Sequence, residues 1–164
     1  MENPVAAEGS VPNPILNSPQ KSKTRTVFIF LVPALWIVAL FLPAYIFPGD
    51  SNNASESMMG IWSFVFGWVA NPLAFLAWLA NIPFLKTYFE LQSGKLINKG
   101  MVIFAGAAFL LSLSALTITE LPNNEGGVSN PAYPSIGAFV WIASMLALFV
   151  GTIIVKRTQL SKRA

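Results

Sequence analysis

Apolar residues form four long blocks along the chain, and polar residues gather between them. The blocks cover residues 27–47, 61–85, 101–119 and 136–155, and none contains a charged residue. A helix needs about 20 residues to cross the hydrocarbon core of a bilayer, so each block is long enough. The blocks are apolar all round and lack the polar face that a helix of a soluble bundle presents to water. The pattern therefore predicts an all-α fold, an integral membrane four-helix bundle.

The segments that flank the four blocks have a different composition. Residues 1–26 are rich in Pro, Asn and Ser, which predicts a disordered cytoplasmic tail. Residues 156–164 predict a short basic cytoplasmic tail. The lead before the first block and the block itself are both longer than those of a typical cleaved signal peptide. We therefore expect the first block to be retained as an anchor and residues 27–155 to form the transmembrane domain.

The distribution of charge predicts the orientation of the bundle in the membrane. Only 10% of the residues are charged, whereas 54% are hydrophobic, which is far less charge than a globular surface carries. The loops 48–60 and 120–135 contain acidic residues and no Lys or Arg. The positive-inside rule then places both termini and the middle loop in the cytoplasm, an N-in/C-in topology. The predicted topology determinants are Lys21, Lys23, Arg25, Lys86, Lys95, Lys99, Lys156 and Arg157.

The same distribution bears on the partners of the chain. The net charge is +3, but the basic residues flank apolar blocks instead of forming one patch. This placement favours attraction to anionic lipid over contact with nucleic acid. We expect the lipid bilayer as the first partner and no nucleic acid.

Small residues spaced four apart predict where helices approach one another. Ala143, Ala147 and Gly151 form such a row in the fourth block, and Ser63 and Gly67 form one in the second. Helices in lipid associate through close backbone contact, which small side chains permit. We interpret both rows as packing faces within one bundle. A homodimer seam is the alternative that the sequence leaves open.

Residue types that commonly carry chemistry are missing from the chain. It has no histidine and no cysteine, so the commonest general base, the commonest metal ligand and any thiolate nucleophile are absent. No Asp, Glu, Lys, Arg or His lies within an apolar block, whereas proton-driven transporters usually need a charged or acid–base residue there. We therefore expect no catalysis, no metal and no cofactor.

The second block contains a short sequence repeat. Trp68-Val69-Ala70-Asn71-Pro72 is followed ten residues later by Trp78-Leu79-Ala80-Asn81-Ile82-Pro83. A continuous helix from residue 61 would place Asn71 about 15 Å deep, near mid-membrane, and Asn81 near the cytoplasmic face. Proline removes a helix hydrogen bond and frees a carbonyl. Asn71, Pro72 and Asn81 are therefore the candidate polar intramembrane site, although a kink satisfied by neighbouring helices is the favoured interpretation.

Four short stretches carry a resemblance to a known group. Gly67-Trp68, Asn71-Pro72, Trp78-Leu79-Ala80-Asn81 and Trp141-Ile142-Ala143-Ser144 resemble small uncharacterised four-span bacterial inner-membrane proteins. The similarity extends over residues 58–151. The resemblance implies a bacterial inner-membrane location and no known activity.

These observations leave three functional hypotheses. The leading one is a structural, accessory or immunity-type binding partner of another membrane protein, or of a second copy. The alternative is an oligomeric channel or facilitator subunit for a small neutral solute, with Asn71-Pro72 lining the path. The third is a subunit of a larger enzyme complex, whose assembly would be lost on its deletion.

Overall fold

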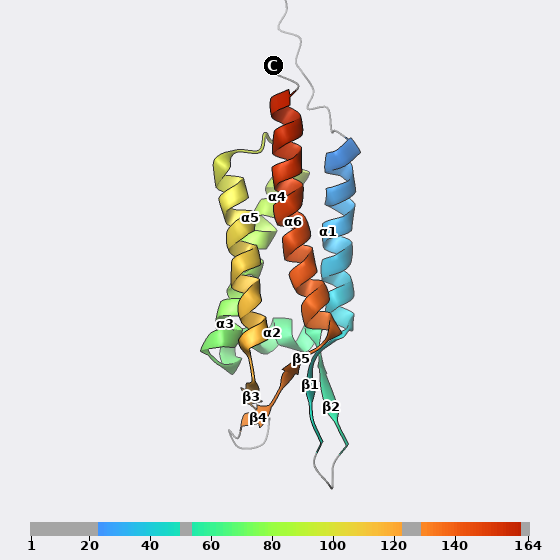
Figure 1. Cartoon of the computed structure of the whole chain (residues 1–164), viewed down its shortest axis with the longest axis vertical. Helices are drawn as coiled ribbons and strands as arrows, with labels where there is room; N and C mark the ends of the chain where they lie inside the picture. Colours follow the sequence, from blue (N-terminus) through green and yellow to red (C-terminus); the bar gives the residue numbers. More distant parts are fainter. Residues whose placement is uncertain (1–22, 50–53, 123–128, 162–164) are drawn as a thin grey trace, which may run out of the picture.

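The computed structural model describes residues 23–49, 54–122 and 129–161. The fold is an elongated helical bundle with two small sheets at one end (Figure 1). The start of α1, the α4–α5 connection and the end of α6 lie together at the opposite end (Figure 1). The helices are α1 (Lys23–Phe41), α2 (Gly60–Ala70), α3 (Pro72–Leu79), α4 (Asn81–Gln92), α5 (Lys99–Ser112), the 3-10 helix η1 (Leu113–Thr117) and α6 (Ile136–Ser161).

Three helical segments are long and apolar enough to cross a membrane, judged by length and composition: Lys23–Phe41, Lys99–Thr117 and Ile136–Ser161. They fall on the first, third and fourth apolar blocks. The prediction of a mostly helical fold is therefore confirmed. The helix that begins at Lys23 also takes in the last residues of the segment predicted as a disordered tail; residues 1–22 lie outside the described part.

The prediction of an all-α fold is confirmed only in part, because two small antiparallel sheets are also present. β1 (Pro43–Phe47) lies between β2 (Glu56–Met59) and β5 (Tyr133–Pro134), and β3 (Glu120–Pro122) pairs with β4 (Ser129–Pro131). The block 27–47 ceases to be helical after Phe41. Pro43 disfavours helical backbone at Leu42, and the aromatic and branched residues that follow suit a strand. Hydropathy measures the length of an apolar run and does not report this change of conformation.

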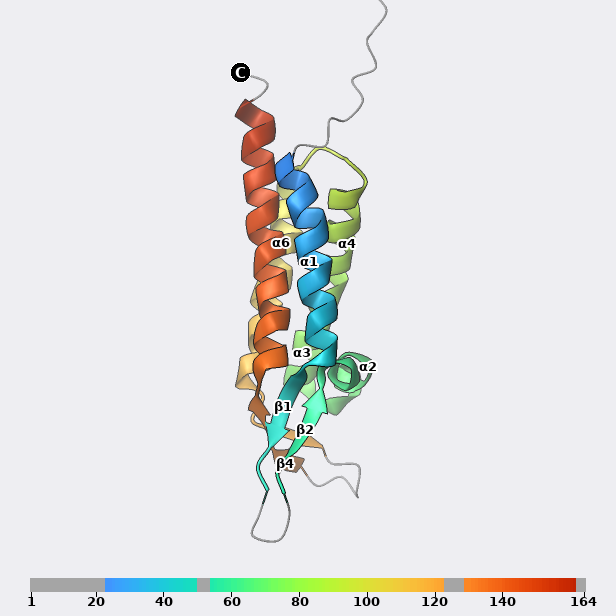
Figure 2. The same cartoon turned by 90° about the vertical axis from the view of Figure 1, so that its right-hand side faces the viewer.

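The prediction of one continuous helix over residues 61–85 is wrong. The block is divided into α2, α3 and the first part of α4. α2 lies across the end of the bundle and is seen almost end-on in Figure 2, while α1, α4 and α6 run lengthwise. The lengthwise column formed by α3 and α4 therefore runs from Pro72 to Gln92, about 30 Å at 1.5 Å per residue. The lengthwise column thus begins at Pro72, whereas the predicted helix began at residue 61.

The bundle core is centred on α6, which packs most extensively against α1 and α5. Phe84, Met101, Met145 and Leu148 are fully buried members of this core. α1 contains Pro33, which cannot donate to the carbonyl of Ile29 one turn earlier. The Tyr88 hydroxyl on α4 donates to that carbonyl over 3.2 Å instead. A neighbouring helix thus satisfies the acceptor that the proline leaves free.

Candidate functional site: a pocket at the sheet end of the bundle

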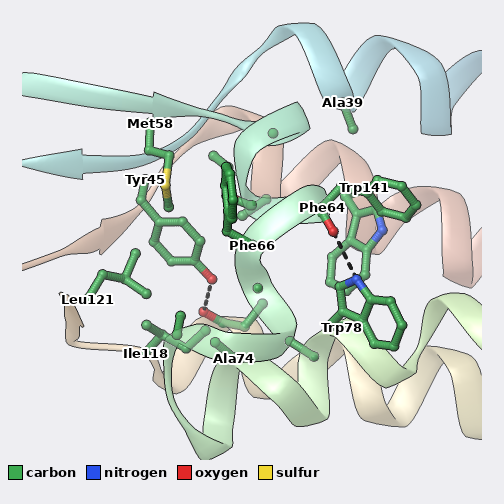
Figure 3. Close-up of a pocket in the computed structure, with 18 of the residues that line it drawn as sticks. Ala39, Tyr45, Met58, Phe64, Phe66, Ala74, Trp78, Ile118, Leu121 and Trp141 are labelled. Carbon is green, nitrogen blue, oxygen red and sulfur yellow. Dashed lines mark hydrogen bonds between the residues drawn. The ribbon is translucent and has the colours of Figure 1, made fainter. Parts of the chain in front are cut away.

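A pocket of about 100 Å³ lies where α2 and α3 meet the sheet-end parts of α1, α6 and η1 (Figure 3). Space remains there because the helices approach through small side chains, which cannot fill the gap between their backbones. Most of the small residues in the wall are alanine and glycine: Ala39, Ala44, Gly60, Gly67, Ala70, Ala74, Ala77, Ala115 and Ala138.

Two aromatic side chains in the pocket wall have their polar atoms engaged (Figure 3). The Tyr45 hydroxyl donates to the Ala115 carbonyl over 3.1 Å, and the Trp78 indole donates to the Phe64 carbonyl over 2.8 Å. Burial raises the pKa of the Tyr45 phenol above its ordinary value, because a buried phenolate would lose its solvation. Tyr45 therefore remains a neutral donor that connects β1 to η1.

Ser63 differs from these two residues. Its hydroxyl oxygen is buried and has no hydrogen-bond partner among the described residues, and its side chain lines the pocket. A buried polar group without a partner costs about 1–3 kcal/mol. The pocket therefore contains one polar group that a bound molecule could satisfy.

Asn81 connects three helices at the edge of the pocket. Its side-chain oxygen accepts from the indoles of Trp36 on α1, over 3.2 Å, and Trp141 on α6, over 3.3 Å. Its amide nitrogen donates to the Trp78 carbonyl over 2.9 Å, at the break between α3 and α4. The residue is only 4% exposed. The buried amide is thus satisfied by groups that fix α1 and α6 against the broken column.

Asn71 and Pro72 form the start of α3. Asn71 has extended backbone (φ −163°, ψ 169°), and its side-chain oxygen accepts from the Ala74 amide over 2.8 Å. Pro72 occupies the first helical position of α3. An N–H group at this position has no intrahelical acceptor, so the missing N–H of proline costs no helix hydrogen bond. The Asn71 amide nitrogen donates to the Glu120 carbonyl of β3 over 3.0 Å. The proline therefore begins a helix here, where a kink within one helix was expected.

The structure does not bring the two asparagines into one site. They lie at opposite ends of α3, about 15 Å apart along its axis at the usual rise per residue. Asn71 is at the sheet end, so its predicted position halfway along a continuous helix is wrong. The oxygen and nitrogen of each side-chain amide are both engaged within the protein.

The predicted packing residues occupy different environments. A Cβ atom on Gly67 would lie 3.6 Å from the Trp78 side chain, so this glycine faces α3. A Cβ atom on Gly151 would lie 2.7 Å from the Phe28 ring, so α6 approaches α1 closely at this point. Ala147 is half-buried against the core, whereas Ala143 is exposed. One end of the α6 row therefore faces outward.

Most of the predicted topology determinants lie at the end opposite the sheets. Lys23 and Lys99 begin helices there, Lys95 lies in the α4–α5 connection, and Lys156 and Arg157 are near the end of α6. The Lys86 ammonium lies 3.7 Å from the centre of the Phe104 ring, a cation–π contact between α4 and α5. Lys21 lies outside the described residues.

Arg25 was predicted as a topology determinant, and it also makes hydrogen bonds that the charge distribution did not predict. It is only 4% exposed. Its guanidinium donates twice to the Leu91 carbonyl, over 2.8 and 2.6 Å, and once to the Lys95 carbonyl over 2.9 Å. The last carbonyls of a helix lack intrahelical donors and carry partial negative charge. Arg25 of α1 therefore caps the C-terminus of α4.

Sequence reasoning missed the pocket and the tryptophans that bind Asn81. Ala70, Ala74 and Ala77 have the spacing of one helix face, a signal that could have indicated a small-residue wall. Trp36 and Trp141 are 105 residues apart in the sequence, so no local pattern joins them. Among the described residues, no three potential metal ligands cluster. Comparisons of the chain with family models, curated proteins and solved structures give no match.

Proposed function

We propose that the protein is an integral membrane protein with four crossings that acts by binding another membrane protein. The crossings are α1, the α3–α4 column, α5 with η1, and α6. The supporting observation is the outward face of the bundle, where large apolar side chains are exposed on different columns. Phe30 on α1 is 71% exposed, and Ile103 and Leu110 on α5 are 70% and 67% exposed. Such surface is disfavoured in water and suited to lipid or protein.

The charges support an N-in/C-in orientation of this bundle. Basic residues gather at the end where α1 begins and α6 ends. The sheet end carries Glu56 and Glu120, and its loops contain no Lys or Arg. The positive-inside rule assigns the basic end to the cytoplasm. The resemblance noted above makes the bacterial inner membrane the proposed location.

Ala143 supports binding of a partner helix. It is exposed on α6, next to the half-buried Ala147, so a second helix can approach the α6 backbone there. Close approach through small residues is a main source of helix association in lipid. The channel alternative lacks such support, because both polar groups of Asn71 are already engaged with Ala74 and Glu120.

The membrane part of the proposal can be tested by labelling, since the chain has no cysteine. Single cysteines replace Ser57 on β2 and Ser93 after α4, both of which are exposed. A thiol reagent that cannot cross membranes should label Ser57→Cys in intact cells, and Ser93→Cys only after the membrane is opened. Labelling of both from the outside would overturn the proposed crossings.

The partner part is tested by photocrosslinking in native membranes. A photoreactive amino acid at Ala143 should give a discrete adduct with another protein chain. The same residue at Phe30 is the control and should give lipid adducts. Lipid adducts alone at both positions would refute a partner on this face of α6.

A further inference from the structure

A groove lies next to the alanine-lined pocket along α2. This groove of about 420 Å³ shares Met58 and Phe66 with the pocket wall. Trp62 and Phe66, whose rings stack 5.8 Å apart, both line the groove. Ser63 and Gly67, on the same helix, line the pocket. The pocket and the groove therefore adjoin along α2, with Met58 and Phe66 between them.

The two spaces have different chemistry. The pocket walls are apolar, and its Ser63 hydroxyl lacks a partner among the described residues. The residues that line the groove include Glu56, Asn130 and the aromatic pair. A carboxylate beside aromatic rings favours a cation, because ring faces attract positive charge as well.

The shared border allows one molecule to occupy both spaces. Met58 is unbranched and adapts its shape readily, although it packs against a buried apolar cluster, and Phe66 is 54% exposed. Ordered water is a poor occupant of the pocket, because a buried water needs two to four polar partners. Tyr45 and Trp78 already direct their donors to backbone carbonyls there.

The geometry points to a binding site for a single-chain amphiphile with an amine head. The apolar chain lies among the alanines of α2 and α3. A carbonyl group next to the chain accepts a hydrogen bond from the Ser63 hydroxyl. The ammonium head lies in the groove, next to Glu56 and over the rings of Trp62 and Phe66. No covalent step is involved. The inference goes beyond the proposed partner binding and depends on the membrane location only for access to such molecules.

The test uses purified full-length protein and N-(2-aminoethyl)hexanamide, whose short chain suits a pocket of about 100 Å³, with a photoreactive diazirine near its chain end. Labelled peptides are mapped by mass spectrometry. We expect labelling of α3, competed by the unmodified amide and not by hexanoic acid, which has the opposite charge. Labelling confined to the outer faces of α1 and α5, equal competition by hexanoic acid, or no labelling of α3, as in a pocket holding only water, would overturn the inference.

Substitutions test the pocket and the position of the head group separately. Ala74→Leu fills the pocket and should abolish α3 labelling, whereas Ala34→Leu at an exposed position of α1 should leave it unchanged. Glu56→Gln should weaken binding roughly tenfold through loss of the charge contact. Glu90→Gln, a carboxylate change on α4, is its control. Unchanged α3 labelling in Ala74→Leu refutes the pocket, and equal effects of the two glutamine variants refute the head position.

Ser63→Ala keeps the test decisive if Ala74→Leu fails to fold. Removing an unpartnered buried hydroxyl should raise the melting temperature of the ligand-free protein. The same change should lower affinity for the amide roughly fivefold, the value of one hydrogen bond. A purely structural serine would not give these opposite signs, so a lower melting temperature or unchanged affinity counts against the site. None of these measurements needs the proposed protein partner, so the two proposals fail independently.

Discussion

Asn71 and Asn81 belong to two copies of one short pattern, and they stand at the two ends of α3. Asn71 has extended backbone and starts a new helix. Asn81 is the first residue of α4 and directs its side chain between α1 and α6. The copies differ in the position of proline, which follows Asn71 directly and follows Asn81 after Ile82.

That single residue accounts for the difference. A proline disfavours helical backbone in the residue before it, so Asn71 leaves the helix and its side chain caps the next one. Ile82, which precedes Pro83, keeps helical backbone within α4, and Pro83 lies in the first turn, where N–H groups need no intrahelical partner. Asn81 therefore stays close to the helical column, and its amide can reach neighbouring helices. The comparison shows that proline spacing decides whether an asparagine starts a helix or joins several.

The largest effect is expected when the second copy is converted into the first. Ile82→Pro places a proline directly after Asn81 and should force that residue into extended backbone. The column would separate between α3 and α4, and the bonds to Trp36 and Trp141 would be lost. We expect a loss of about 3 kcal/mol or more in the free energy of unfolding. Unfolding of the detergent-solubilised protein measures it, with Ile82→Ala as the control; equal stability of the two variants would contradict the argument.

The next largest effect concerns the Asn81 side chain alone. Asn81→Leu leaves two indole N–H groups without an acceptor near the core. Each unsatisfied buried group costs about 1–3 kcal/mol, so we expect a loss of about 2–3 kcal/mol in the free energy of unfolding. Tryptophan fluorescence should also shift, because Trp36 and Trp141 change partners. Ile82→Leu, at an exposed neighbour, is the control, and a loss no greater than in this control would show that Asn81 does not join the helices.

Arg25 extends the comparison to the other end of α4, where the cap comes from a different helix. Arg25→Lys keeps the positive charge but removes the planar fork that donates to Leu91 and Lys95. We expect a loss of about 1–2 kcal/mol in the free energy of unfolding, with unchanged labelling of Ser57→Cys and Ser93→Cys. An altered labelling pattern would mean that Arg25 acts mainly through topology. Lys23→Arg, at an exposed position, is the matched control.

The smallest effect is expected at Asn71. Asn71→Ala removes the N-cap of α3 and should cost about 1 kcal/mol. Asn71→Ser keeps a capping oxygen and should recover most of that loss. Thermal unfolding of both variants measures the difference. A loss as large as that of Asn81→Leu would show that the two copies have similar tasks, contrary to the structure.

Features that depend on the length of apolar runs could be predicted from the sequence. Features that depend on the local backbone conformation could not. The helices of the first, third and fourth blocks could be located because long apolar runs report them directly. The strand at Pro43–Phe47 could not, since its residues are as apolar as the helix before it. The break at Asn71 was readable from Asn-Pro as a cap followed by the first helical position, but the apolar context suggested a kink. The pocket and the Trp36–Asn81–Trp141 contacts join distant segments, which no local pattern reports.

The contact between Arg25 and Leu91 spans 66 residues of the chain, and this has a consequence for biosynthesis. α1 leaves the ribosome long before the helix end that its arginine caps. Until residues 90–95 have been made, Arg25 has none of these carbonyls to bind and remains at the surface of a lone helix. The first closure of the bundle therefore waits for the completion of α4. A nascent chain that stalls before residue 91 carries a first helix that is not yet locked in place.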